Sequence, residues 1–219
     1  MLEISELLDL NRTIAAEVFD GKIYPWEVLD DIKDFILKLG PTLPEDEFDN
    51  PSDGVWIAKD AKIFPSAYIG SPCIIDSGAE VRHCAFIRGS AIVGKNAVVG
   101  NSTELKNVIL FDNVQVPHYN YVGDSILGYK AHMGAGGITS NVKSDKSRVV
   151  VKTDDEQFIT GRKKFGAILG DNTEVGCNSV LNPGTVLGRN VSVYPTSCVR
   201  GFVPQDCIYK DKDHIVKRG

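Results

Sequence analysis

The chain has 219 residues, of which 42% are hydrophobic, and its formal net charge is −5. This composition excludes general disorder and allows one substantial core with a small accessory segment. The negative charge provides no basic field, so we expect small-molecule or protein partners and no binding to nucleic acid or to a membrane. No long apolar run occurs, and MLEISELLDL carries acids where a signal peptide carries Lys or Arg. These features favour a cytoplasmic protein.

Residues 1–50 predict a small helical unit followed by a linker. The first amphipathic helix would use Ile4, Leu7, Leu8, Ile14 and Val18 and end at Gly21. A second helix would open at Pro25 and stop at Gly40. We expect both helices to cap the open end of the domain that follows, with binding of a partner as the alternative. The acidic stretch PEDEFDNPSD at 44–53 indicates a linker.

Residues 51–219 contain a six-residue repeat. Its aliphatic positions are Ile57, Ile63, Ile69, Ile75, Val81, Ile87, Val93, Val99 and Leu105, and it resumes at Leu169, Val175, Leu181, Leu187, Val193 and Val199. Between these runs, Leu110, Val116, Val122, Leu127 and Met133 continue it with two steps of five. A small residue, mostly Ala, lies two positions before most members of the first run. A period of six fits neither a strand nor a helix alone.

The repeat predicts an all-β domain, a left-handed parallel β-helix of hexapeptide repeats with an N-terminal pair of α-helices. Three hexads close one triangular coil, and the aliphatic side chains stack inside it. About seven coils would span residues 55–203. The charged stretch 140–165 breaks the period, and we expect it to project as a loop with a hairpin.

Five cysteines at positions without CxxC spacing indicate reduced thiols rather than disulfides. Arg88 and Lys106 are 18 residues apart and would stack at one corner of successive coils. A phosphate between them would relieve their repulsion, although two solvated surface cations are the alternative.

His118 lies between the two irregular steps, where a side chain can point away from the regular wall, so it is a candidate general base. Tyr121 could bind a substrate hydroxyl or orient the imidazole. His132 follows after 14 residues, close to one coil, so the two imidazoles could share a groove. Two His residues also allow a zinc site, but His83 and His214 do not complete a recognisable ligand set, so we expect no metal.

The run GAGGIT at 134–139 offers free backbone N–H groups for a thioester oxygen or a pyrophosphate, and turn glycines explain it equally well. A basic cluster follows in the predicted loop, comprising Lys143, Lys146, Arg148, Arg162, Lys163 and Lys164. It could bind the phosphates of CoA or keep the loop soluble.

Four ordered segments, STELKNVIL, VPHYNYVGDSILG, MGAGGITSN and TGRKKFGAILGD, resemble the C-terminal acetyltransferase half of the bifunctional GlmU-type and archaeal sugar-1-phosphate nucleotidylyltransferases. The resemblance implies a homotrimer that transfers acetyl from acetyl-CoA, without a metal, to the amine of glucosamine-1-phosphate or galactosamine-1-phosphate. It implies that His118 is the base and that Arg88, Lys106 and Tyr121 hold the sugar phosphate, with His132 as a further substrate-binding residue. Ala135, Asn141, Lys146 and Cys177 would then bind acetyl-CoA.

This chain departs from that family at two points. His132 occupies the place of an Asn in the family's N-I-G-A-G run, and only about 50 helical residues precede the solenoid, so we expect no uridylyl transfer. An inactive solenoid that binds a sugar nucleotide, or that scaffolds a separate nucleotidyltransferase, is the alternative function. Another amino sugar or a nucleotide sugar as acceptor also stays open.

Overall fold

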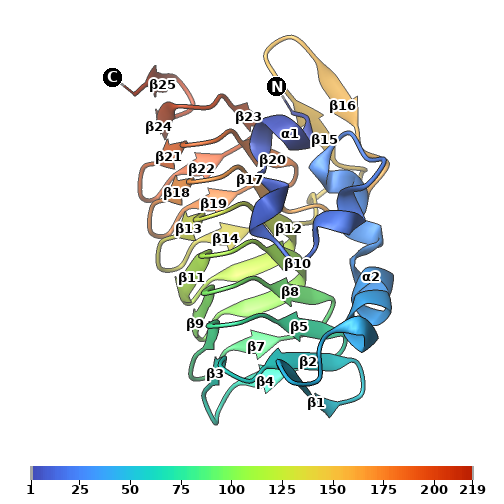
Figure 1. Cartoon of the computed structure of the whole chain (residues 1–219). Helices are drawn as coiled ribbons and strands as arrows, with labels where there is room; N and C mark the ends of the chain where they lie inside the picture. The colour runs from blue at the N-terminus through green and yellow to red at the C-terminus, as the bar shows by residue number, and fades with distance from the viewer. Residues whose placement is uncertain (1, 219) are drawn as a thin grey trace.

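The aliphatic positions of the six-residue repeat line the interior of a three-sided solenoid. From Ile75 to Val199, each of them is at most 4% exposed. The computed structural model describes residues 2–218 and confirms the predicted left-handed parallel β-helix (Figure 1). Within the described part of the chain, no helix is long and apolar enough to cross a membrane.

The solenoid has three faces, and each face is a ladder of short parallel strands. The covered face lies under the N-terminal segment and contains β2 (Val55–Ala58), β5 (Cys73–Ile75), β8 (Ala91–Val93), β10 (Glu104–Leu110), β12 (Tyr121–Leu127), β17 (Ala167–Leu169), β20 (Thr185–Leu187) and β23 (Phe202–Val203). The polar face contains β3 (Lys62–Ile63), β6 (Glu80–Val81), β9 (Val98–Asn101), β11 (Gln115–His118), β13 (His132–Met133), β18 (Glu174–Val175), β21 (Ser192–Val193) and β24 (Cys207–Asp211), followed by the antiparallel β25 (His214–Lys217). The open face contains β4 (Tyr68–Ile69), β7 (Phe86–Ile87), the first residues of β10 and β12, β14 (Ile138–Thr139), β19 (Val180–Leu181) and β22 (Cys198–Val199).

The corner between the covered and polar faces turns through a left-handed backbone conformation in successive coils. Asn96, Asn113, Asn172 and Asn190 occupy this corner with φ between 55° and 60°. Asn tolerates positive φ better than other side-chain-bearing residues, because its short amide can hydrogen-bond locally. Asn therefore favours the bend in these four coils, while Gly78, Lys130 and Asp206 take the same conformation in others.

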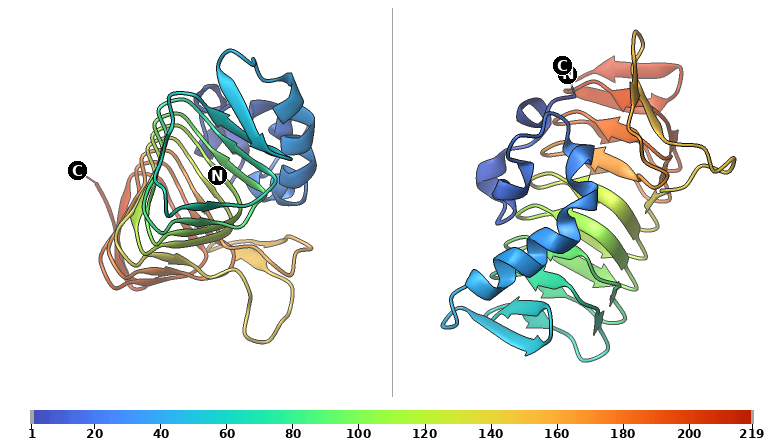
Figure 2. Two further views of the ribbon diagram at one scale, coloured as in Figure 1. Left: turned by 90° about the horizontal axis from the view of Figure 1, so that it is seen from below. Right: turned by 90° about the vertical axis from the view of Figure 1, so that its right-hand side faces the viewer.

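The two five-residue steps shorten the corner between the open and covered faces. Because only Lys106 and Asn107 form this corner in one coil, and Gly123 and Asp124 in the next, β10 and β12 run through it without interruption. One coil higher, the same corner carries the insertion 140–166, which contains the predicted hairpin of β15 (Val150–Lys152) and β16 (Gln157–Ile159). The insertion projects away from the solenoid (Figure 2).

The N-terminal segment differs from the predicted pair of helices and from the predicted place over the first coil. It consists of α1 (Ile4–Leu7), η1 (Leu10–Arg12), η2 (Ala16–Phe19), η3 (Pro25–Asp30), α2 (Ile32–Leu39) and η4 (Gly40–Thr42). The first helix is short because Leu8 and Thr13 are extended and the Asp9 side chain accepts a hydrogen bond from the Asn11 N–H, which forms a 3₁₀ turn instead. The stop at Gly40 is confirmed, but Pro25 opens the 3₁₀ helix η3 and the α-helix begins only at Ile32. Part of the predicted linker forms β1 (Phe48–Ser52), antiparallel to β2.

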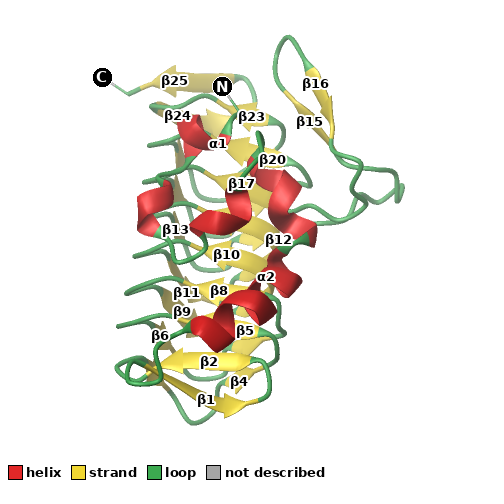
Figure 3. Cartoon of the chain, turned by 45° about the vertical axis from the view of Figure 1, so that its right-hand side comes forward, coloured by secondary structure: helices red, strands yellow, loops and turns green. Residues whose placement is uncertain are grey.

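An outward row of apolar side chains explains why the segment lies along the side of the solenoid. The row consists of Ile74, Ile92, Ile109, Ile126, Ile168 and Val186, all fully buried. Strand residues alternate in direction, so these neighbours of the inward residues point out of the coil and need a cover. α2 packs against β8 and β10, and η3 packs against β12 (Figure 3).

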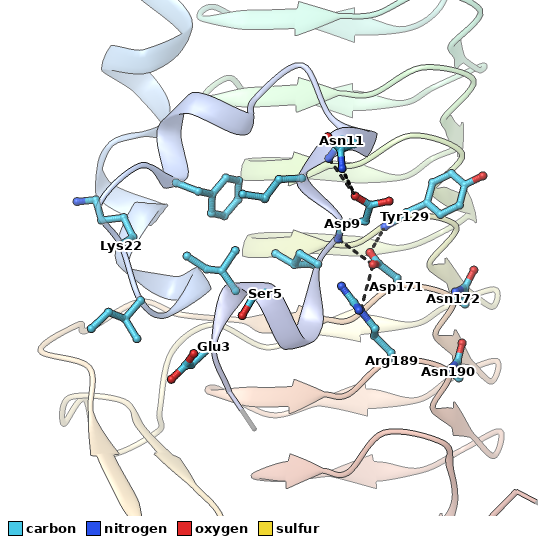
Figure 4. Close-up of a pocket in the computed structure, with 15 residues that line it drawn as sticks. Glu3, Ser5, Asp9, Asn11, Lys22, Tyr129, Asp171, Asn172, Arg189 and Asn190 are labelled. Carbon is cyan, nitrogen blue, oxygen red and sulfur yellow. Dashed lines mark hydrogen bonds and ion pairs between the residues drawn. The ribbon is translucent and has the colours of Figure 1, made fainter.

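A buried carboxylate fixes the beginning of the segment to the solenoid. Asp171 accepts hydrogen bonds from the N–H groups of Asp9 and Tyr129, each at 2.8 Å (Figure 4). Its own N–H donates to the carbonyl of Leu7 at 3.0 Å. Arg189 Nε lies 3.3 Å from the carboxylate. Burial raises the pKa of Asp171, while the Tyr129 N–H and Arg189 lower it.

Asp171→Ala should release the first residues of the N-terminal segment. The loss of the buried acceptor costs about 2 kcal/mol, which corresponds to roughly thirtyfold faster amide exchange in that segment. Hydrogen exchange with mass spectrometry of residues 2–20 measures this effect. The control is Asp154→Ala in the exposed hairpin turn; equal exchange in the two variants would show that Asp171 is no anchor.

Candidate functional site

Arg88 and Lys106 stack at the corner between the open and covered faces, as the sequence predicts. Ile87 pairs with Leu105, so the residues that follow them occupy equivalent places in successive coils. Each cation has a carboxylate partner within the chain: Arg88 Nη1 lies 2.9 Å from Glu104, and Lys106 Nζ lies 2.9 Å from Asp124. The expected repulsion between the two cations is therefore already reduced without a bound anion.

Asp124 organises this corner, although the repeat pattern does not single it out as a site residue. Its side chain is 4% exposed and accepts hydrogen bonds from Lys106 at 2.9 Å, from Asn107 at 3.0 Å and from Asn141 at 2.5 Å. One feature of the sequence could have indicated it: Asp124 is an acid within the second five-residue step. At such a shortened corner its side chain is held against the neighbouring polar residues. Asp124 thus fixes one predicted substrate ligand, Lys106, to one predicted cofactor ligand, Asn141.

Tyr121 belongs to the same network. Its hydroxyl accepts a hydrogen bond from Asn141 Nδ2 at 3.2 Å. Burial raises the pKa of Tyr121, and the charges of Asp124 and Glu104 raise it further. The phenol therefore stays protonated at neutral pH and keeps its O–H available to donate to a bound ligand.

His118, Ala135 and Cys177 form a second column, at the corner between the polar and open faces. The Gly136 N–H donates to the His118 carbonyl at 3.0 Å, and the Asn178 N–H donates to the Ala135 carbonyl at 2.8 Å, so the three residues stack coil upon coil. The His118 side chain is exposed, and no side chain within residues 2–218 hydrogen-bonds its ring. The Ala135 N–H likewise donates to no group in the described chain. A free imidazole thus lies one coil from a free N–H.

His132 lies apart from His118. It pairs in register with Gln115, three residues before His118, which places the two His about 10 Å apart along the strand direction. Its Nδ1 lies 2.8 Å from Glu174 on the polar face. The structure therefore gives no support to a groove shared by the two imidazoles.

The predicted basic cluster divides into three parts. Lys143 pairs with Asp145 and Arg162 pairs with Asp30, while Lys146 and Arg148 are exposed in the insertion. Lys163 and Lys164 line a cavity of about 660 Å³ that also contains Lys106. A separate cavity of about 890 Å³ surrounds the Asp171 anchor, and none of the predicted site residues lines it (Figure 4).

The comparisons with known proteins agree with the solenoid and its motifs. Residues 71–164 match the family model of the GMPPB C-terminal domain. The chain is 32% identical over 196 residues to the bifunctional protein GlmU of Methanococcus maripaludis, covering 88% of this chain and 47% of the relative. It is 30% identical over 145 residues to the bifunctional sugar-1-phosphate nucleotidylyltransferase/acetyltransferase of Sulfurisphaera tokodaii, covering 66% of this chain and 36% of the relative. A solved hexapeptide transferase family protein of Anaplasma phagocytophilum is similar with a TM-score of 0.42 and 15% identity, over 76% of this chain and 81% of that one.

The chain is a hexapeptide-repeat β-helix protein. Its solenoid is homologous to a part of the GlmU-type bifunctional proteins, which confirms the resemblance that the four motifs indicate. The chain spans about a third to a half of the length of these relatives.

Asp124→Asn should lower the pKa of Tyr121, because it removes one of the negative charges that raise it. It should also destabilise the fold by about 1–3 kcal/mol, since Lys106 loses its buried partner. NMR titration of the Tyr121 Cζ resonance measures the pKa, and thermal unfolding measures the stability. Asp112→Asn, at the opposite corner, is the matched control. A Tyr121 pKa that does not change in Asp124→Asn would contradict this description of the network.

Proposed function

We propose that this protein is an acetyl-CoA-dependent N-acetyltransferase that acts on an amino sugar phosphorylated at C1, with glucosamine-1-phosphate and galactosamine-1-phosphate as the first candidates. The observation that carries the proposal is the unpartnered His118 imidazole one coil from the unpartnered Ala135 N–H. A base and an oxyanion donor at that spacing suit acyl transfer.

In the proposed reaction, the acceptor amine adds to the thioester carbonyl carbon while His118 takes one of its protons. The Ala135 N–H stabilises the oxyanion of the tetrahedral intermediate. The C–S bond then breaks, and His118 returns the proton to the departing sulfur, so the products are the acetamido sugar and CoA. No covalent intermediate on Cys177 is needed, because no base within the described chain contacts its thiol.

The acceptor phosphate would bind at Arg88 and Lys106, and the Tyr121 hydroxyl would lie between the phosphate and His118. His132 would contact the outer part of the acceptor, in place of the family's Asn. On the acetyl-CoA side we place Ala135, Asn141, Lys146 and Cys177.

A cavity at the C-terminal coils suits the rest of CoA. Its volume is about 670 Å³, and it opens where Pro195 and Thr196 continue the column of His118, Ala135 and Cys177. Four cations line it: Lys152, Arg200, Lys210 and Lys212. Charge-assisted hydrogen bonds from these side chains would hold the CoA phosphates.

His118→Ala should lower kcat by roughly 10² to 10⁴ and leave the fold intact. Release of CoA thiol, measured with a panel of amino-sugar 1-phosphates and nucleotide-linked amino sugars, gives the rate. His83→Ala is the matched control, because His83 lies in the same column two coils earlier and its ring nitrogen hydrogen-bonds Ser66. Unchanged turnover in His118→Ala would remove His118 from the mechanism, and no thiol release with any acceptor would favour a binding or scaffold protein.

We further propose a homotrimer in which the open faces meet. On this face the exposed rings of Tyr68 and Phe86 lie side by side, with 5.4 Å between their centroids, and Ile138 is 38% exposed. The other two faces are less suited, because one lies under the N-terminal segment and the other carries mostly polar side chains. His118 and Tyr121 border the open face, so each site would lie between two copies.

Phe86→Asp should dissociate the trimer, since it places a charge in an apolar contact. Light scattering after size exclusion measures the mass. Gln115→Asp on the polar face is the control and should stay trimeric. A Phe86→Asp protein that keeps the wild-type mass would show that the open face is not the interface.

A further inference from the structure

The N-terminal segment and the insertion together close a pocket beside the candidate site. This junction pocket is the cavity of about 660 Å³ between residues 29–33, the corner at Lys106 and Asp124, and residues 160–164. None of the site residues assigned above comes from the N-terminal segment. Apart from Lys106, the residues that line this pocket have no role in the proposed binding of the acceptor.

Its walls are held in place by specific contacts. The Arg162 guanidinium donates two hydrogen bonds to Asp30, at 2.5 and 2.8 Å, and Asn107 Nδ2 donates to the Leu29 carbonyl at 2.9 Å. The aromatic ring of Trp26 lies 5.9 Å from that of Phe165. The three parts of the wall are thus joined to one another, which keeps the pocket open in a fixed shape.

The charged side chains of the pocket that form no ion pair with one another are all positive. Its two carboxylates, Asp30 and Asp124, are both occupied, by Arg162 and by Lys106. Lys33, Lys163 and Lys164 also line it, and none of the three forms an ion pair within residues 2–218. Three unpaired ammonium groups around one cavity favour a ligand with several negative charges.

The position and the size of the pocket indicate which ligand this is. Lys106 lies both in the pocket and in the pair proposed to hold the C1 phosphate, so the pocket extends from that phosphate away from His118. A volume of about 660 Å³ is within the range of pockets that enclose a drug-sized molecule, and a single phosphate would leave most of it unfilled. A second phosphate and a nucleoside would fill it.

We propose that the junction pocket binds the distal phosphate and nucleoside of the acceptor, so that the preferred acceptor is a nucleoside-diphosphate amino sugar. This inference rests on the proposed function and refines its acceptor. Lys33, Lys163 and Lys164 contact the distal phosphate, and Lys106 contacts the phosphate on C1. The described residues that line the pocket include no aromatic ring, so the diphosphate rather than the base is recognised.

Binding of UDP and UMP, measured by isothermal titration calorimetry, tests the proposal without any acetyl transfer. Wild-type protein should bind UDP roughly tenfold or more tightly than UMP, with an affinity that falls as salt is added. Lys33→Gln and the double variant Lys163→Gln/Lys164→Gln should each weaken the binding of both nucleotides by about threefold to tenfold, because UDP and UMP share the phosphate attached to the nucleoside. Lys38→Gln, on the same helix but outside the pocket, is the matched control.

Equal affinity for UDP and UMP, or UDP binding that does not respond to Lys33→Gln, would overturn the inference. The experiments distinguish failure of the proposed acetyltransferase reaction from failure of the proposed nucleotide binding in the junction pocket. Thiol release from glucosamine-1-phosphate together with no binding of UDP would leave the acetyltransferase intact and remove the junction pocket from it. Lys33-dependent binding of UDP without thiol release from any acceptor would support the pocket and contradict the reaction.

Discussion

The stacking of one coil on the next in fixed register is the constraint on which the rest of this structure depends. Inward aliphatic side chains and parallel ladder hydrogen bonds set the length of the coils, so residues 16 to 18 positions apart return to the same place outside the insertion. Because of this repeat, equivalent residues of successive coils stack in columns, and the candidate site residues lie mainly in two such columns. One column stacks His118, Ala135 and Cys177, and the other stacks Arg88 on Lys106.

The inward pattern was predictable from sequence because it repeats strictly, and the structure confirms it together with the projecting hairpin. The outward row that begins at Ile74 was not recognised, although the same counting could have found it one position before each inward residue. The N-terminal segment was misplaced for that reason: without the row there is no apolar side to cover. Its irregular turns depend on tertiary contacts such as the Asp171 anchor, and no local pattern in the sequence encodes them.

The candidate site was predicted in part for similar reasons. The spacing alone correctly predicted that Arg88 and Lys106 stack, because their separation in sequence equals one coil. Their carboxylate partners were missed, since Asp124 reaches Lys106 only through the bend of a shortened corner. His132 was misplaced relative to His118 because a separation of 14 residues is three short of the register of that coil. In a solenoid, an error of a few residues moves a side chain along the face and out of the site.

We propose different roles for the two corners that border the open face. We assign acyl transfer to the corner at His118, where neither the imidazole nor the Ala135 N–H has a hydrogen-bond partner in the described chain, and binding of the anionic acceptor to the charged corner at Lys106. A crystal structure with acetyl-CoA and a C1-phosphorylated acceptor analogue lacking the amine nucleophile tests this arrangement most directly. We expect the thioester oxygen to lie about 3 Å from the Ala135 N–H, and the carbon that bears the amine in the true substrate to face His118. A thioester bound at another corner, or an acceptor turned away from His118, would contradict it.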